Sequence, residues 1–165
     1  MPRVYAHYMQ SRYVSGLTVR SLQDGDTETV SALFGRLGDR SRERRFCGAK
    51  PRLSDLELAN LARVDRDHHV LVGYVDGDAE PVGIARLVRS GPTAEVAFAV
   101  ADAYQSRGVG SVLASELAAD ARAAGITQLT ATVCGDNPRI LALLQRFGSL
   151  HTRWRGGERE LVVGL

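Results

Sequence analysis

The first third of the chain carries apolar residues at helical spacing. Between residues 30 and 37 they stand at positions i, i+3, i+4 and i+7, an aspartate before them can cap a helix, and Gly38 can end it. Ser54 and Glu57 form a capping box before a second run of apolar residues. These patterns predict two amphipathic helical segments, of which the second ends near Val64.

From residue 70 onward the period changes from helical to extended. Residues 70–75 and 82–88 are separated by an Asp-Gly-Asp turn and predict two antiparallel strands. Residues 94–100 predict the next strand, residues 108–124 a long helix and residues 129–133 a buried strand. Because a helix lies between these last two strands, we expect them to be parallel neighbours joined by a right-handed crossover.

The remaining segments complete one domain. A further helix is predicted from Asn137, a last strand over residues 160–163 and a first strand over residues 17–20. Residues 1–16 form a polar, tyrosine-bearing N-terminal extension, which is either disordered or docked. A chain of 165 residues is long enough for one domain with a core and too short to suggest two. We therefore predict an α/β fold with a mixed sheet in a single domain, residues 17–165.

Composition and charge narrow the class of protein. Hydrophobic residues make up 44% of the chain and charged residues 24%, as in ordinary soluble globular proteins. The net charge of +2 creates no broad positive field, so we expect no nucleic-acid partner. No apolar run reaches membrane-spanning length, and the N-terminal segment lacks the apolar core of a signal peptide. We expect no membrane partner and a cytoplasmic location.

The cysteines and histidines give no signal for a metal site. Cys47 and Cys134 lie far apart in the sequence and form no C-x-x-C pattern, so we expect two buried thiols and no disulfide. His68 and His69 leave a loop into a strand and have no third ligand nearby. We expect them to face solvent, and we expect no metal.

Residues 105–110, with the sequence QSRGVG, join the strand at residues 94–100 to the long helix. Several backbone N–H groups at such a junction have no partner, and the helix dipole favours an anion there. Side chains at Gly108 and Gly110 would hold a phosphate away from these groups. The segment therefore predicts a cradle for a pyrophosphate, with Arg107 adding a positive charge. A glycine-rich turn without a ligand is the alternative.

Two other phosphate-binding loops do not fit. A P-loop needs Gly-Lys-Ser/Thr at the start of the helix, whereas Ser111 and Val112 follow Gly110. The dinucleotide fingerprint G-x-G-x-x-G needs a glycine at Leu113 and an early strand.

Two motifs carry a family resemblance. QSRGVG, after the strand AEVAFAV and before the helix SVLASELAADARAAG, resembles the acyl-CoA-binding motif of the GNAT N-acetyltransferases. Residues 137–148, NPRILALLQRFG, are similar to that family's later helix motif N-x-x-x-x-x-L-x-x-x-x-G. The resemblance extends from about Leu17 to the C-terminus. Residues 94–98 look most like the bacterial protein-lysine acetyltransferase branch.

The resemblance implies a fold and a cofactor site. The fold is a mostly antiparallel twisted sheet flanked by helices, with one parallel strand pair that diverges where coenzyme A binds. Acetyl-CoA is implied as co-substrate, with its pantetheine arm along the end of one strand and its pyrophosphate on the following loop. Asn137 either contacts the cofactor or only caps its helix. The implied cofactor-binding residues are Phe98, Ala99, Val100, Gln105, Ser106, Arg107, Gly108, Val109, Gly110, Ser111 and Asn137.

Glu95 is the candidate general base. With a period of two it shares a strand face with Ala97 and Ala99, so it is a carboxylate in an otherwise apolar strand. The lysine-acetyltransferase branch has its presumed base on this strand. The alternative is a structural residue at an edge or in an ion pair with an arginine such as Arg86.

The chain departs from the family at the general acid. Leu144 stands where a tyrosine is usual, and Ser149 stands where an aromatic residue often follows the glycine. Either the thiolate leaves without this acid, or another group such as Tyr104 supplies the proton. The missing tyrosine also leaves open a non-catalytic acyl-CoA sensor.

The predicted reaction is direct transfer of an acetyl group from acetyl-CoA to a primary amine. A protein lysine is the preferred acceptor, and small amines and N-terminal amino groups are the alternatives. Residues 41–46 predict a short helical turn whose arginines either guide an acidic substrate or form a solvated face. The sequence carries no signal for an oligomeric state.

Overall fold

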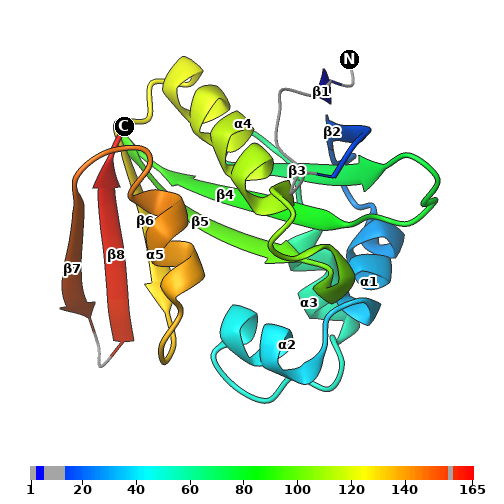
Figure 1. Cartoon of the computed structure of the whole chain (residues 1–165). Helices are drawn as coiled ribbons and strands as arrows, with labels where there is room; N and C mark the ends of the chain where they lie inside the picture. The colour runs from blue at the N-terminus through cyan, green and yellow to red at the C-terminus, as the bar shows by residue number, and fades with distance from the viewer. Residues whose placement is uncertain (1–2, 6–13, 156–157) are drawn as a thin grey trace.

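The computed structural model describes residues 3–5, 14–155 and 158–165. Over these residues the chain forms one sheet of eight strands in the order β1-β2-β3-β4-β5-β6-β8-β7 (Figure 1). The strands are β1 (Arg3–Tyr5), β2 (Leu17–Ser21), β3 (His68–Val75), β4 (Gly83–Ser90), β5 (Thr93–Val100), β6 (Gln128–Val133), β7 (Leu150–Arg155) and β8 (Glu158–Gly164). The helices are α1 (Thr27–Gly35), α2 (Asp39–Phe46), α3 (Asp55–Leu61), η1 (Asp102–Tyr104), α4 (Val109–Ala123) and α5 (Pro138–Leu144).

Helices cover both faces of the sheet. One core cluster joins α4 to the sheet, where Leu113 and Leu117 of α4 are completely buried. A second cluster joins the sheet to α1 and α3 around Val30 and Val70. The strands therefore show alternating burial, and on β5 Ala94 and Val96 face α4 whereas Glu95 lies on the opposite face. This alternation places Glu95 on the same side of the sheet as α2.

The parallel pair β5–β6 is the feature that opens a site. Only three residue pairs hold it together, from Thr93 with Gln128 to Glu95 with Thr130. Beyond them β5 stays paired with β4 as far as Val100, and β6 stays paired with β8. The two strands thus diverge in the middle of the sheet, as Figure 1 shows. The predicted mixed sheet with one diverging parallel pair is confirmed.

Three elements were missed or underestimated by the hydrophobic pattern. β7 has mostly exposed residues and lies at the sheet edge, so it carries no alternating signal. α2 contains no buried residue, and its start is held by the distant Asp102, which accepts hydrogen bonds from Gly38 N and Ser41 Oγ. Part of the N-terminal extension, β1, pairs with β2. Residues 1–2 and 6–13 of that extension lie outside the described residues.

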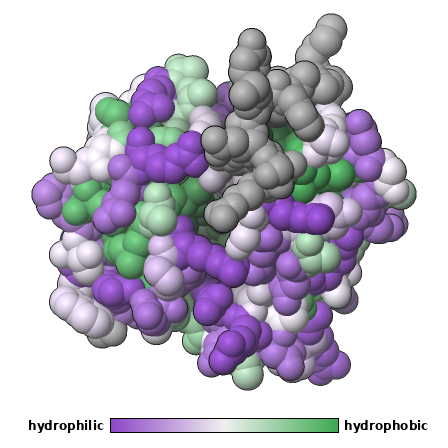
Figure 2. Space-filling view, in the orientation of Figure 1, coloured by the Kyte–Doolittle hydropathy of each residue, from purple (hydrophilic) through white to green (hydrophobic). Residues whose placement is uncertain are grey.

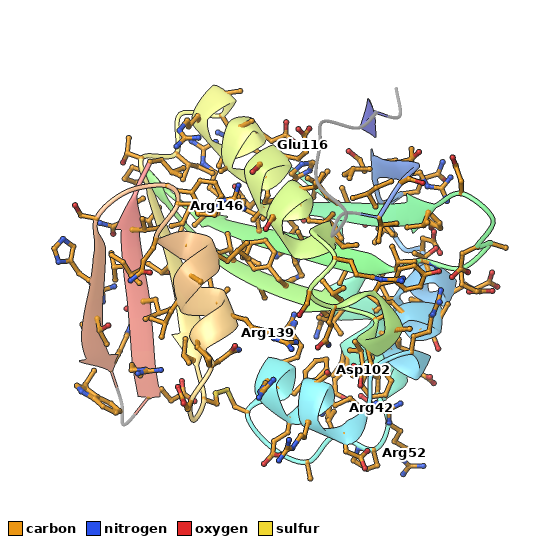
Figure 3. The ribbon with its side chains drawn as sticks, in the orientation of Figure 1. Arg42, Arg52, Asp102, Glu116, Arg139 and Arg146 are labelled. Atoms are coloured by element: carbon orange, nitrogen blue, oxygen red, sulfur yellow. A yellow bond between two sulfur atoms is a disulfide. The ribbon has the colours of Figure 1, made fainter. Side chains whose placement is uncertain are left out.

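The expectation of two free thiols is wrong, because Cys47 and Cys134 form a disulfide. Their Cα atoms lie 5.2 Å apart although 87 residues separate them in the chain. Cys47 follows α2 and Cys134 follows β6, so the disulfide links the end of α2 to the end of β6 (Figure 3). Spacing along the sequence contains no information on this proximity.

The expectation that His68 and His69 face solvent is also wrong. His68 Nδ1 lies 2.7 Å from Asp65 Oδ1, and His69 Nε2 lies 2.9 Å from Asp120 Oδ2. Both rings are partly buried and have carboxylate partners, so they do not simply face solvent. None of the helices in the described ranges has the length and apolar character needed to cross a membrane.

Candidate active site

The diverging strands open a cleft of about 840 Å³ between β5 and β6. Its walls come from α2, β5, the loop before α4, β6 and α5. Figure 2 shows hydrophobic surface around α5 and hydrophilic side chains over α2, on the two sides of this region. Most predicted site residues line the cleft: Glu95, Phe98, Ala99, Val100, Gln105, Ser106, Gly108, Gly110, Ser111 and Asn137.

Arg107 and Val109 do not line it. The side chain of Val109 is buried against the sheet. Its N–H group can still point to a ligand, because backbone groups at a helix start do not follow the side chain. The Arg107 guanidinium carbon lies 5.6 Å from the centre of the Tyr104 ring.

The edge of β5 presents unpaired backbone groups to the cleft. Ala101 N donates to Val82 O at 2.9 Å, which fixes the alternation of this antiparallel ladder. Odd-numbered residues of β5 therefore bond to β4, and the N–H and C=O groups of Val96, Phe98 and Val100 face the other way. β6 pairs with β5 only as far as Glu95, and Val100 O accepts a hydrogen bond from Gln105 Nε2, so the backbone of Phe98 and the N–H of Val100 remain free to bind an extended ligand.

The phosphate loop has the geometry that its glycines predict. Gly108, the N-cap of α4, has φ +85°, and no side chain caps this helix. The hydrogen bond from Val112 N to Gly108 O at 3.0 Å begins the helical pattern, so the N–H groups of residues 109–111 have no helical partner. A Cβ atom on Gly110 would have Val100 Cγ2 as its nearest neighbour, at 3.7 Å. The cradle is thus open, electropositive and not filled by the protein itself.

Gln105 holds this loop in place through its side chain. Its Nε2 donates to Ser41 Oγ at 3.0 Å and to Val100 O at 3.1 Å, and it lies 3.2 Å from Asp102 Oδ1. Its Oε1 accepts a hydrogen bond from Arg139, which reaches across from α5 (Figure 3). The Gln105 side chain therefore connects α2, β5, η1 and α5, and only its backbone remains for a ligand.

Asn137 and the tyrosine position have structural explanations. Asn137 Oδ1 accepts from Ile140 N at 3.4 Å and caps α5, with Pro138 in the first turn. Leu144 is completely buried in the core, so the residue in the tyrosine position does not reach the cleft. The Tyr104 hydroxyl donates to Asp78 Oδ2 at 2.8 Å, and Arg36 donates to the same oxygen at 2.7 Å. These donors hold the pKa of Asp78 well below its usual range.

Glu95 stands where the strands separate, and its side chain is exposed to the cleft instead of buried. Thr132 Oγ1 on β6 lies 3.4 Å from Glu95 Oε1. Among the described residues no cation lies within 4.0 Å of this carboxylate, so the expected alternative of an ion pair with Arg86 is not realised. The carboxylate is accessible and poised at the floor of the cleft.

Arg45 is the site residue that sequence reasoning did not single out. It lies in the last turn of α2 and lines the cleft together with Glu95. Burial and, to a smaller extent, the positive charge of Arg86 lower the pKa of Arg45 to about 10, although the charge of Glu95 acts in the opposite direction. The signal in the sequence was the run of arginines at residues 42–45, which a solvated helix face explained equally well.

No group of three or more histidine, cysteine, aspartate or glutamate side chains that could hold a metal is found within residues 3–5, 14–155 and 158–165. The cleft combines a strand edge, an anion cradle and the carboxylate of Glu95. A sequence model described as "Acetyltransferase (GNAT) family" matches residues 38–149. The chain belongs to the GNAT acetyltransferase family.

Individual relatives agree with this assignment. The chain is 34% identical to Acetyltransferase Pat of Mycolicibacterium smegmatis over 140 residues, which cover 82% of this chain and 41% of that protein. It resembles the crystal structure of the GNAT domain of S. lividans PAT with a TM-score of 0.79 and 29% identity, covering 90% of each chain. It resembles a cAMP-binding acyltransferase from Mycobacterium smegmatis with a TM-score of 0.65 and 26% identity, covering 99% of this chain and 47% of that one.

The chain spans about two fifths of the length of the curated relative that it matches. GNAT acetyltransferases use acetyl-CoA. The predictions of the family, of the fold and of an acyltransferase domain are confirmed.

Proposed function

We propose that this chain transfers the acetyl group of acetyl-CoA directly to a primary amine, and that the amine is a lysine side chain of a protein. The observation that carries the proposal is one continuous backbone surface. It begins at the unpaired edge of β5 and runs into the uncapped amides at the start of α4. We infer that residues 17–165 form the catalytic domain and residues 1–16 an extension to it.

The cofactor-binding roles follow from this surface. The pantetheine arm pairs with the backbone of Phe98 and the N–H of Val100, next to Ala99, and the pyrophosphate lies on the amides of residues 106–111. Arg107 supplies a mobile positive charge near this cradle. Gln105 acts by holding the loop, and Asn137 acts by holding the start of α5 beside the cofactor.

Glu95 acts as the general base in the proposed reaction. The amine nitrogen attacks the thioester carbonyl, and the amine proton passes to Glu95 directly or through water. The C–S bond then breaks, and the coenzyme leaves as a thiolate. The exposed position of Glu95 in the cleft, without an ion-pair partner among the described residues, supports this role.

One observation favours a second candidate function, a non-catalytic acyl-CoA sensor. Leu144 is buried, and the hydroxyl of Tyr104 is already donated to Asp78, so neither residue is placed to protonate a leaving thiolate. A protein of this kind would keep the cradle and lack turnover. A thiolate is a good leaving group near neutral pH, because its conjugate acid has a pKa near that of a free thiol, about 8.5. We therefore prefer the enzyme.

The resemblance of residues 94–98 to the protein-lysine branch supports a lysine acceptor, and the similarity to Acetyltransferase Pat agrees with it. Small amines and N-terminal amino groups are the alternatives. Three acceptors separate them: a peptide blocked at both ends with one lysine, a lysine-free peptide with a free N-terminus, and a small diamine.

The test measures consumption of acetyl-CoA with each acceptor and locates the added acetyl group by mass spectrometry. We expect turnover with the blocked lysine peptide, and acetylation of its side-chain nitrogen. Binding of acetyl-CoA without turnover on any acceptor would establish the sensor instead. Turnover only with the N-terminal or small amines would change the acceptor and keep the reaction.

A further inference from the structure

The acceptor end of the cleft contains positive charge that the protein leaves uncompensated. Arg45 makes no ion pair or side-chain hydrogen bond with any residue that the structure describes, although its guanidinium lies 4.9 Å from the Phe46 ring. Taking a cation out of water is costly unless a counter-charge or a set of acceptors replaces the water. A binding partner that brings an anion would supply this compensation.

A second arginine lies next to the first. Arg86 stands opposite Ala97 in the β4–β5 register, so it shares a sheet face with Glu95. Its Nη2 donates to Asn60 O at 3.1 Å, but its Nε is buried and has no hydrogen-bond partner among the described residues. Such an orphaned donor is unusual in a native protein, where most buried polar atoms are satisfied.

The two arginines meet at a small side cavity of about 30 Å³. Arg45 lines both this cavity and the main cleft, as do Ala97 and Ala99 of β5. The rest of the side cavity is largely apolar, with Leu37 and Phe46 in its wall. The positive charge therefore borders the cleft on the face of β5 that carries Glu95.

Glu95 does not neutralise both arginines. It carries one negative charge against two positive ones, and it lies beyond 4.0 Å from either guanidinium. Burial lowers the pKa of both arginines, and the attraction of Glu95 opposes this only in part. Arg139 is different, because it is engaged by Gln105.

We propose that Arg45, with the buried charge of Arg86 behind it, recognises a carboxylate that the acceptor carries next to its reactive amine. This inference rests on the proposed acetyl transfer and adds the substrate class. A guanidinium binds a carboxylate with two parallel hydrogen bonds, which fixes the position of a flexible acceptor. The amine of the same acceptor then lies beside Glu95.

Two sources can supply such a carboxylate. One is an aspartate or glutamate next to a lysine in a peptide, and the other is the α-carboxylate of a small amino acid. The experiment compares two peptides blocked at both ends, in which the lysine is flanked either by glutamate or by glutamine, with free lysine as a third acceptor. The variants are Arg45→Gln, Arg45→Glu and the control Arg40→Gln. Arg40 is exposed on the same helix and lies outside the cleft.

In the wild type we expect a lower KM for the glutamate peptide than for the glutamine peptide. Arg45→Gln should raise the KM for the glutamate peptide roughly 10- to 100-fold, the effect of losing one hydrogen-bonded charge pair. It should leave the KM for the glutamine peptide and for acetyl-CoA unchanged. Arg45→Glu should reverse the preference, with a lower KM for the glutamine peptide than for the glutamate peptide, and Arg40→Gln should behave as the wild type.

Each result bears on one question. A preference for free lysine that depends on Arg45 keeps the carboxylate and assigns it to a small amino acid. If the wild type has equal KM values for the two peptides and for free lysine, the carboxylate inference is overturned, but the proposed acetyl transfer stands. If Arg40→Gln raises the KM for the glutamate peptide as much as Arg45→Gln does, the carboxylate inference is also overturned. No turnover with any acceptor, with acetyl-CoA still bound in calorimetry, rejects the proposed function itself. Thermal melting of each variant confirms that it is folded.

Discussion

The two halves of the cleft are built in different ways. The proposed cofactor half consists of backbone groups, namely the free edge of β5 and the amides that begin α4, and all of them lie within residues 96–111. The acceptor half consists of side chains from segments far apart in the sequence. Arg45, Arg86 and Glu95 come from α2, β4 and β5, and a disulfide from Cys47 to Cys134 connects its two sides.

This difference implies that the two halves tolerate substitutions differently. Backbone recognition requires a strand that ends, a glycine at a helix start and little else, so it tolerates many side chains nearby. Side-chain recognition changes with a single substitution. We therefore expect changes in the acceptor half to alter the acceptor KM and leave acetyl-CoA binding intact, and changes in the cofactor half to do the reverse.

The largest expected effect is at Glu95, where the two halves meet. Glu95→Gln keeps the size of the side chain and removes the base, so turnover at neutral pH should fall by roughly 10²- to 10⁴-fold. Acetyl-CoA affinity should hardly change. Raising the pH toward the lysine pKa, near 10.4, should partly rescue the variant because more of the amine is then neutral. Turnover measured against pH for both proteins checks this.

A matched control makes the Glu95 result specific. Glu43→Gln makes the same change on an exposed part of α2 that does not line the cleft. It should leave turnover unchanged. Near-normal turnover of Glu95→Gln at every pH would leave this carboxylate without a catalytic role and would remove the link between the two halves.

The next largest expected effect comes from removing the disulfide, which should lower stability without changing cofactor binding. Replacing both Cys47 and Cys134 by serine releases a link between residues 87 positions apart, which on the loop-entropy estimate lowers the free energy of unfolding by roughly 4.5 kcal/mol. The folded variant should bind acetyl-CoA as before, because no cofactor contact is lost. Denaturant unfolding and calorimetry measure the two quantities.

Reduction of the wild type by a dithiol provides the control for this prediction. It should reproduce the loss of stability in the wild type and have no effect on the double variant, which has no disulfide to reduce. If the reduced wild type keeps its full stability, the two cysteines do not restrain the fold. If acetyl-CoA affinity falls with the stability, the two halves are not independent.

The contrast also accounts for what could be predicted from the sequence. The parallel strand pair, the loop at residues 105–110 and α4 follow from local pattern, because hydrophobic alternation and glycine position are properties of neighbouring residues. The divergence of the pair was implied only by the family resemblance. β7 was not predicted because an exposed edge strand shows no alternation of hydrophobic and polar residues. The disulfide and the proximity of Arg45 and Arg86 were not predicted because they depend on contacts between segments that are distant in the sequence. The sequence marked Glu95 as a carboxylate in an apolar strand, and the family resemblance favoured it as the base. Its exposure and the absence of an ion pair with Arg86 are properties of the folded chain.

The smallest effect tests the cofactor half at Gly110. Gly110→Ala adds a Cβ atom with an ordinary contact of 3.7 Å to Val100 Cγ2, and Gly110→Leu extends a side chain into the cradle. Because glycine is a poor helix former, both variants should be as stable as the wild type or more stable, by up to about 1 kcal/mol. Their acetyl-CoA affinity should fall nonetheless. One displaced hydrogen bond between a phosphate and the backbone corresponds to roughly a tenfold loss or more, and leucine should cost more than alanine.

Gly35→Leu is the matched control for Gly110→Leu. Gly35 ends α1, is exposed, has open space around its Cβ position and lies outside the cleft. Calorimetry with acetyl-CoA and thermal melting should show affinity and stability moving in opposite directions only at Gly110. Unchanged affinity in Gly110→Leu would place the pyrophosphate elsewhere. Since every other cofactor contact is assigned by continuity from this cradle, the backbone surface along β5 would then lose its role as well.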